Sequence, residues 1–311
     1  MKFLIGVALL NAVFTVANAI TDCTVCLNGQ CHASAGFYDG INKISTSHMV
    51  IDFNSNILYH YNEGINAINL DTNTMTPIPM QGKGNYLAVD QDTGDLYYYR
   101  NANFNNTIYK YHPKTGQTEV INVPIPESSP PPLNVLVHNG SLYFNTHRES
   151  GYDVANGLNI LTGSVIKKIA ALDNFTVNNI VIDKNGIIYI KSGPEIYRLM
   201  PNANEAVLFV EAKYLISGDR NGEVYFFDPS NRYFYKVNED GDDLINIGAY
   251  DPKRDGRERP KLKEFIFDKH GNVIIKDKWS TMYYKSNPSR CTFTFDGNTG
   301  RTRITKVKQR K

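Results

Sequence analysis

The chain is poor in the features that mark several common protein classes. Its 311 residues include one Trp and four Cys, and Lys plus Arg (33) nearly balance Asp plus Glu (31). Without a strong excess of positive charge, the chain does not resemble a nucleic-acid-binding protein. Residues 20–311 hold no apolar run near the roughly 20 residues that a membrane-spanning helix needs. The 41% apolar content, with 20 Tyr and 15 Phe, supports a large core and excludes wholesale disorder.

The sequence also lacks the familiar catalytic motifs. It contains no GxSxG elbow, no HExxH pair, no P-loop and no Asp-rich calcium loop. The His residues are scattered singly, mostly in segments that resemble strand ends or turns. These absences predict a protein that is not an enzyme, with no catalytic residues, no metal and no cofactor.

The first nineteen residues resemble a signal peptide. Lys2 precedes an apolar run from Phe3 to Val16, and the segment 17–19 (Ala-Asn-Ala) has the small-x-small pattern of a cleavage site. The run is shorter than a membrane anchor requires. We therefore expect a secreted protein whose mature chain begins at Ile20.

Secretion makes the four cysteines informative. An even number of Cys in an oxidising compartment favours two disulfides, although the Cys23-x-x-Cys26 spacing also occurs in metal sites. The four residues are Cys23, Cys26, Cys31 and Cys291. If all are oxidised within the chain, each of the three possible pairings joins one N-terminal Cys to Cys291, and which one it is stays open. Three N-glycosylation sequons begin at Asn105, Asn139 and Asn174.

From residue 48 onward the sequence repeats a single pattern. An apolar run leads to an acidic or amide turn and then to a Tyr-rich strand, with anchors at Asp52, Asp90, His138, Asp183, Asp219 and Asp268. The mean spacing of about 43 residues is that of a propeller blade. Short alternating runs broken by Gly, Asn or Pro exclude a helical solenoid. We therefore predict an all-β, six-bladed β-propeller over residues 20–300, closed by a disulfide-fastened seam between its termini.

Three segments interrupt or follow this pattern. Residues 124–132 are proline-rich and residues 251–263 are rich in charges of both signs, so both are expected to be exposed loops. Residues 301–311 carry six cations and no acid, and we expect them to form a mobile, basic C-terminal tail. An alternative function follows from this charge: the basic loop and tail would bind anionic partners.

A polar ring is predicted at one end of the channel, since the first strand of each blade lines it. The positions four residues before the anchors are His48, Tyr86, Asn134, Asn179, Leu215 and Glu264. The residue after each is apolar (Met49, Leu87, Val135, Ile180, Ile216 and Phe265). One carboxylate is too few for a hard cation, which argues against a metal-dependent propeller hydrolase of the lactonase or esterase type. The hydrolase nevertheless stays as an alternative. The ring suits a small planar aromatic ligand bound by His48, Tyr86, Asn134, Asn179 and Glu264, although water filling the channel would explain it equally well.

The whole mature chain resembles the lepidopteran ommochrome-binding proteins. The resemblance rests on the length, the start TDCTVCLNGQCH, the six Tyr-rich repeats and the late Cys291. It implies an insect haemolymph protein that carries ommochrome pigments of the xanthommatin type without a covalent bond. No binding residue follows from it, and the basic tail has no counterpart in it. We expect a monomeric carrier of a small aromatic metabolite, with no nucleic-acid or membrane partner.

Overall fold

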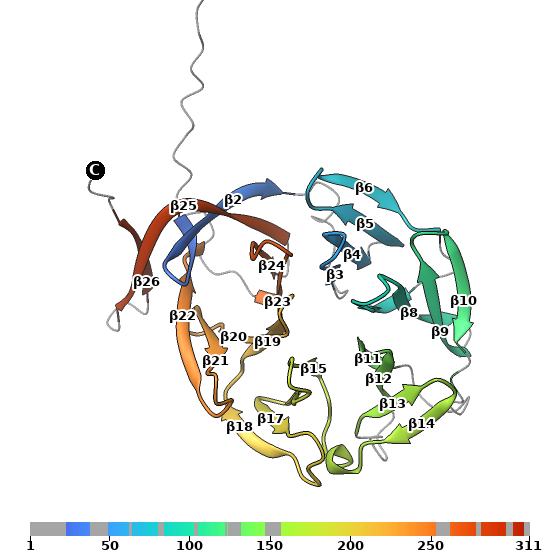
Figure 1. The fold of residues 1–311 in the computed structure, drawn as a ribbon. Coiled ribbons are helices and arrows are strands. Elements are labelled where there is room, and N and C mark those ends of the chain that lie inside the picture. The colour runs from blue at the N-terminus through green and yellow to red at the C-terminus, as the bar shows by residue number, and fades with distance from the viewer. Residues whose placement is uncertain are drawn as a thin grey trace, which may run out of the picture.

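A computed structural model describes residues 23–37, 49–61, 64–79, 84–102, 105–121, 123, 132–146, 157–252, 262–277, 281–296 and 301–307. These residues form an all-β propeller with one short 3₁₀ helix, η1 (Ala170–Leu172). Figure 1 shows the sheets arranged around a common centre. No helix among the described residues is long and apolar enough to cross a membrane. The predicted signal peptide lies outside the described residues.

Four sheets are separate antiparallel blades of four strands. The first contains β3 (Met49–Asp52), β4 (Ile57–Tyr61), β5 (Ile65–Asn69) and β6 (Thr74–Pro77). The second contains β7 (Gly84–Val89), β8 (Leu96–Ala102), β9 (Asn105–His112) and β10 (Gln117–Ile121). The third contains β11 (Pro132–His138), β12 (Ser141–Thr146), β13 (Asn159–Thr162) and β14 (Val165–Lys168). The fourth contains β15 (Asn179–Ile182), β16 (Ile188–Ser192), β17 (Glu195–Leu199) and β18 (Val207–Glu211).

The remaining strands form one ten-stranded sheet. One half contains β19 (Leu215–Gly218), β20 (Val224–Asp228), β21 (Tyr233–Val237) and β22 (Leu244–Tyr250). The other half contains β23 (Leu262–Phe267), β24 (Val273–Asp277), β25 (Thr281–Asp296) and β26 (Arg301–Val307). Between them lies the hairpin of β1 (Cys23–Leu27) and β2 (Gln30–Phe37), in which β1 pairs with β22 and β2 pairs with β25.

The prediction of six blades is therefore wrong. The propeller has four separate blades, and the strands that the repeats assigned to a fifth and a sixth blade belong to one continuous sheet. The N-terminal hairpin causes the difference. Its β1 strand pairs with β22, the outer strand of one half, and its β2 strand pairs with β25, the outer strand of the other half. Asn28 and Gly29, with φ of 49° and 73°, make the two-residue turn that this hairpin needs.

Both disulfides form, as the cysteine count predicted. Cys23 pairs with Cys31 within the hairpin, and Cys26 is the residue that pairs with Cys291. All four are buried with Ala249 and Ile304 in one apolar cluster. The disulfides suit an oxidising compartment, and secretion itself stays a prediction.

The prediction of a mobile C-terminal tail is wrong for residues 301–307. They form β26, which pairs with β25 from Arg301 to Val307. Ile304 is fully buried and the Thr302 hydroxyl donates to the carbonyl of Asn231 at 2.7 Å. Buried and exposed residues alternate along this strand, and the buried Ile304 packs against the disulfides. The prediction considered only the charge of the segment and not this alternation.

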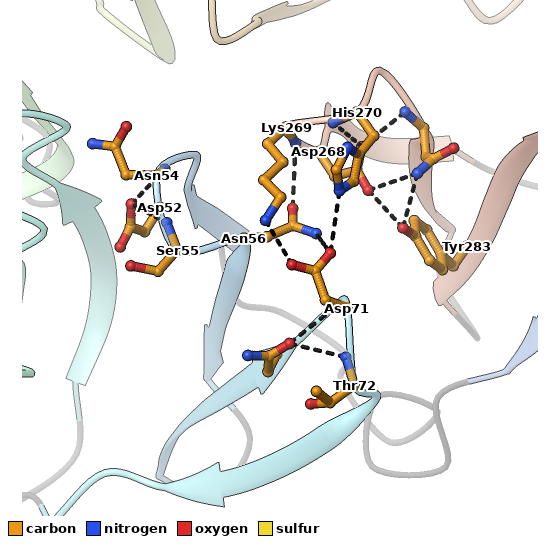
Figure 2. Close-up of polar contacts among 12 residues, drawn as sticks. Asp52, Asn54, Ser55, Asn56, Asp71, Thr72, Asp268, Lys269, His270 and Tyr283 are labelled. Atoms are coloured by element: carbon orange, nitrogen blue, oxygen red, sulfur yellow. Dashed lines mark hydrogen bonds and ion pairs between the residues drawn. The ribbon is translucent and has the colours of Figure 1, made fainter.

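Side chains join the first blade to the turn between β23 and β24 (Figure 2). Asp71 accepts hydrogen bonds from Asn56 Nδ2 and Lys269 Nζ, both at 2.6 Å, and lies 3.2 Å from His270 Nε2. The hydrogen bond from Lys269 is the main cause that lowers the pKa of Asp71 to about 2. Behind these contacts, apolar residues of both sheets share one core cluster. The junction between the ring's first blade and the ten-stranded sheet is thus polar at its surface and apolar inside.

Candidate functional site: the central channel

The first strands of the four blades, with β19 and β23, surround a central channel of about 730 Å³. The six predicted apolar positions, Met49, Leu87, Val135, Ile180, Ile216 and Phe265, all line it and all are buried. The middle of the channel therefore has apolar walls, and its polar groups lie at the two ends.

One end holds the predicted ring. Tyr86, Asn179 and Glu264 line the channel there. Asn134 lies on β11, but its side chain is not among those described, and His48 lies outside the described residues. The structure thus places three of the five predicted ligand residues around one opening, and their role in binding stays a prediction.

Asn179 is engaged by the backbone. Its Oδ1 accepts the N–H of Ile180 at 2.7 Å, and its Nδ2 donates to the carbonyl of Ile216 at 3.4 Å. The second bond joins the fourth blade to β19. The side chain therefore also holds two inner strands together, a structural task that the sequence pattern did not reveal.

Glu264 is the carboxylate at this end. The N–H of Met49 donates to its Oε1 at 3.1 Å, and Lys276 Nζ lies 3.8 Å from Oε2. Lys276 is the residue opposite Glu264 in the β23–β24 register, and its side chain is only 5% exposed. Burial lowers the pKa of Lys276, and the charge of Glu264 opposes that shift.

His60 lies behind this pair. It is fully buried on β4 opposite Met49, and among the described residues neither of its ring nitrogens has a hydrogen-bond partner. Burial, followed by the charge of Lys276, lowers its pKa to about 4. An inner polar layer of Glu264, Lys276 and His60 thus extends outward from the channel.

The sequence analysis missed Lys276 and His60 because it considered only first strands. A signal was present in the sequence: Lys276 follows the apolar run VII, and His60 interrupts the apolar and aromatic run ILYHY. Lys191 is a further basic residue on the second strand of a blade: it lies on β16, opposite Asn179. Its Nζ donates to the carbonyl of Tyr214 at 2.8 Å.

The other end of the channel is built from turns. Asp52, Asp90, Asp183, Asp219 and Asp268 each accept the N–H two residues later, at 2.8–3.0 Å. The repeated acid therefore stabilises its own turn. His138 stands at the equivalent position before Asn139 and Gly140, whose φ values of 48° and 67° form a two-residue turn without such a carboxylate.

The described residues of the channel do not form a site for a divalent cation held by several carboxylates. Within the described part of the chain, no three His, Cys, Asp or Glu side chains form a possible metal site. At the ring end, Glu264 is the one acid that lines the channel among those residues, and Lys276 already pairs with it. Leu215 occupies the corresponding position of β19 and offers no ligand atom.

The predicted glycan acceptors differ in their surroundings. Asn139 and Asn174 are exposed, whereas the Asn105 side chain is not among those described. Asn139 also lies at the turn end of the channel. Both exposed residues are accessible to modification, which stays a prediction.

No family model matches the chain, and no curated protein sequence is significantly similar to it. Solved propeller structures are similar in fold. A gluconolactonase from Xanthomonas campestris is 12% identical, with 84% of this chain and 91% of that chain covered and a TM-score of 0.62. A calcium-binding protein, regucalcin, from Agrobacterium tumefaciens is 12% identical over 82% and 94%, with a TM-score of 0.57. A streptogramin B lyase is 15% identical over 79% and 96%, with a TM-score of 0.53.

These comparisons correct the prediction that the protein is not an enzyme. Proteins named as a lactonase and a lyase share its fold. At 12–15% identity the likeness establishes the fold alone. The chain is a β-propeller similar in architecture to enzymes that carry these names.

Proposed function

We propose that the protein hydrolyses a small ester or lactone in its central channel, with Glu264 as the general base. The observation that carries this proposal is the position of Glu264, which lines the ring end of an apolar-walled channel and is paired with a buried lysine. Convergent charged groups in a large pocket are the usual setting of acid–base chemistry.

The reaction needs only groups that the chain supplies. Water attacks the acyl carbon while Glu264 takes one of its protons, which forms the new C–O bond. The acyl–oxygen bond then breaks, and the proton passes from Glu264 to the leaving oxygen. The products are a carboxylic acid and an alcohol, joined in one molecule when the substrate is a lactone. General-base catalysis of this kind contributes about 10²–10⁴-fold in rate.

Lys276 is a positioning residue in this scheme. Its ammonium group is buried, lies 3.8 Å from Glu264 Oε2 and compensates the charge of that carboxylate, whereas Lys276 is not among the residues that line the channel. The N–H of Met49 holds the other carboxylate oxygen. Together they orient Glu264 toward the channel, and the apolar walls limit competing water.

A second candidate is the carrier of a planar aromatic metabolite suggested by the resemblance to ommochrome-binding proteins. The apolar walls and the half-buried Tyr86 favour it, because a flat ring packs against such a surface. In this case the channel binds xanthommatin, and Glu264 pairs with an amino group of the pigment.

The decisive experiment compares wild type, Glu264→Gln and Asp92→Asn on 4-nitrophenyl acetate and a series of γ- and δ-lactones. Asp92 is the matched control, because it lines the opposite end of the channel. We expect Glu264→Gln to lower kcat/KM about 100-fold or more, Asp92→Asn to leave it unchanged, and chelators to have no effect. Absence of turnover by wild type, together with saturable xanthommatin binding weakened by Tyr86→Ala, would replace the hydrolase by the carrier.

A further inference from the structure

A second cavity of about 540 Å³ lies where the two halves of the ten-stranded sheet meet. Three turns surround it: the β1–β2 turn, the β19–β20 turn and the β23–β24 turn. It exists because the N-terminal hairpin bridges the outer strands of the two halves and leaves a space where their turns diverge. The β19–β20 turn also lines the channel, so the two cavities are neighbours.

The floor of this cavity is apolar. Leu27, Tyr225 and Phe267 line it and belong to the core cluster between the two halves. The rings of Tyr225 and Phe267 pack against each other with centroids 4.6 Å apart. The rim is polar and includes Gln30, Arg220, Asn221, Lys269 and Ser286. The cavity is thus mostly polar with a small apolar base, a lining that suits a ligand with several hydroxyl groups.

The acids of this cavity already have their hydrogen-bond donors. Asp219 accepts the N–H groups of Asn221 and Glu223, both at 2.9 Å, and the Tyr225 hydroxyl at 3.1 Å. Asp268 accepts two backbone N–H groups, the Asn272 amide and the Tyr283 hydroxyl, the last at 2.6 Å (Figure 2). These carboxylates serve the turns and offer a ligand few free acceptors.

Arg220 is an exposed donor on the rim, and it lines both this cavity and the turn end of the channel. Its guanidinium makes no hydrogen bond or ion pair with any residue that the structure describes, whereas Lys269 is paired with Asp71 at 2.6 Å. The turn that carries Arg220 is held in place: the N–H of Lys184 donates to the carbonyl of Gly222 at 2.9 Å. A Cβ at Gly222 would lie 2.9 Å from Lys184, so the two turns touch. The backbone of the turn that carries Arg220 is therefore held against the neighbouring turn.

We propose that this cavity, which adjoins the turn end of the channel, is a second ligand site for a small hydroxylated ring that bears a carboxylate, such as a sugar acid. The C–H face of the ring packs on Tyr225 and Phe267, its hydroxyls bond the side-chain amides of the rim, and Arg220 binds the carboxylate through two parallel hydrogen bonds. Arginine suits this task because its planar fork matches a carboxylate.

The test measures binding of D-glucuronate and D-glucose to the full chain by calorimetry. Wild type should prefer glucuronate, and Arg220→Gln should weaken glucuronate binding about 10-fold with little effect on glucose. Arg220→Lys should retain part of the preference. Arg303→Gln, the same charge change on an exposed residue of β26, should change nothing. Asp92→Asn, at the turn end of the channel, should also leave binding intact, whereas Gln30→Ala should weaken glucuronate binding, because Gln30 lines this cavity and not the channel.

Three results would overturn the inference. These are no glucuronate binding by wild type at millimolar concentrations, equal loss in the Arg220 and Arg303 variants, or loss in Asp92→Asn but not in Gln30→Ala. The last result would place the sugar acid in the channel. The hydrolase is tested by turnover of esters, so either proposal can fail while the other stands.

Discussion

His60 shows how a single side chain links the core to the chemistry of the channel. It lies between the first blade and β24, beside Lys276, and its imidazole is neutral at physiological pH because burial disfavours the charged form. A buried ring without hydrogen bonds costs stability, on the order of 1–3 kcal/mol. A residue that is costly for folding and lies behind a channel carboxylate is characteristic of a functional region.

We predict that His60 makes the protein less stable in mild acid. Its pKa is about 4 in the folded chain, whereas the ordinary value of a histidine is 6.5. Between these values the unfolded state binds a proton that the folded state does not, so stability falls as the pH is lowered from 6.5 to 4. The full effect is about 3 kcal/mol, and no contribution is expected above pH 6.5.

Denaturant unfolding of wild type and His60→Leu between pH 4 and 8 measures this effect. The difference in the free energy of unfolding should be constant above pH 6.5 and should move in favour of the variant below it. The variant should be at least as stable as wild type at pH 7, because it removes two ring nitrogens that have no hydrogen-bond partner in the described part of the chain. Parallel curves across the whole range would contradict the assignment.

At the scale of elements, the N-terminal hairpin decides how the ring closes. Its β1 strand packs against β22 so closely that a Cβ at Gly248 would lie 2.1 Å from the carbonyl oxygen of Cys26. Gly248 therefore allows the approach of two backbones. The Cα of Gly248 is opposite that of Leu27. The pairing of β1 with β22 is followed by a hydrogen bond from the N–H of Asn28 to the carbonyl of Ile247 at 2.7 Å.

Gly248→Ala should push β1 away from β22 and loosen the hairpin. We expect a loss of about 2–4 kcal/mol in the free energy of unfolding, which is typical of a forced close contact. Gly64→Ala is the matched control, because nothing lies within 4 Å of a Cβ at that position. Hydrogen exchange should locate the faster-exchanging amides in residues 23–37 and 244–250. Equal stability of the two variants would show that the strands can separate without cost.

At the scale of the whole molecule, the Cys26–Cys291 disulfide spans 265 residues, whereas Cys23–Cys31 spans 8. Cross-links that close long loops restrict the unfolded chain more strongly. The chain-entropy relation gives about 5.6 kcal/mol for the long loop and about 2.5 kcal/mol for the short one, although strain and residual structure modify both.

The double variant Cys26→Ser/Cys291→Ser should therefore melt about 10 °C below wild type. Cys23→Ser/Cys31→Ser should melt at a temperature between the two, since it opens only the short loop. Differential scanning calorimetry of the three proteins measures this order. A melting temperature unchanged by loss of the long cross-link would mean that strand pairing and the apolar cluster around Ile304 close the ring without it.

Much of this molecule follows from the sequence by itself. The alternating Tyr-rich runs determine strands, the Asn-Gly and Asp-anchored turns determine hairpins, and counting cysteines shows that one N-terminal Cys must reach Cys291. The strands and turns depend on residues that are close together in the chain, and the disulfide argument depends only on the number and positions of the cysteines. The strands and turns also identify Tyr86, Asn179 and Glu264 as lining residues of one channel end, because every unit repeats the same pattern.

Only the tertiary structure decided how the ring closes and what stands behind the channel. The merging of two halves into one ten-stranded sheet depends on hydrogen bonds between β1 or β2 and strands more than 200 residues away, which no local pattern encodes. Lys276 and His60 meet behind Glu264 because two sheets from opposite ends of the chain pack face to face. The charge of a carboxylate and the state of a buried imidazole are set by such neighbours, and neighbours are a property of the folded chain.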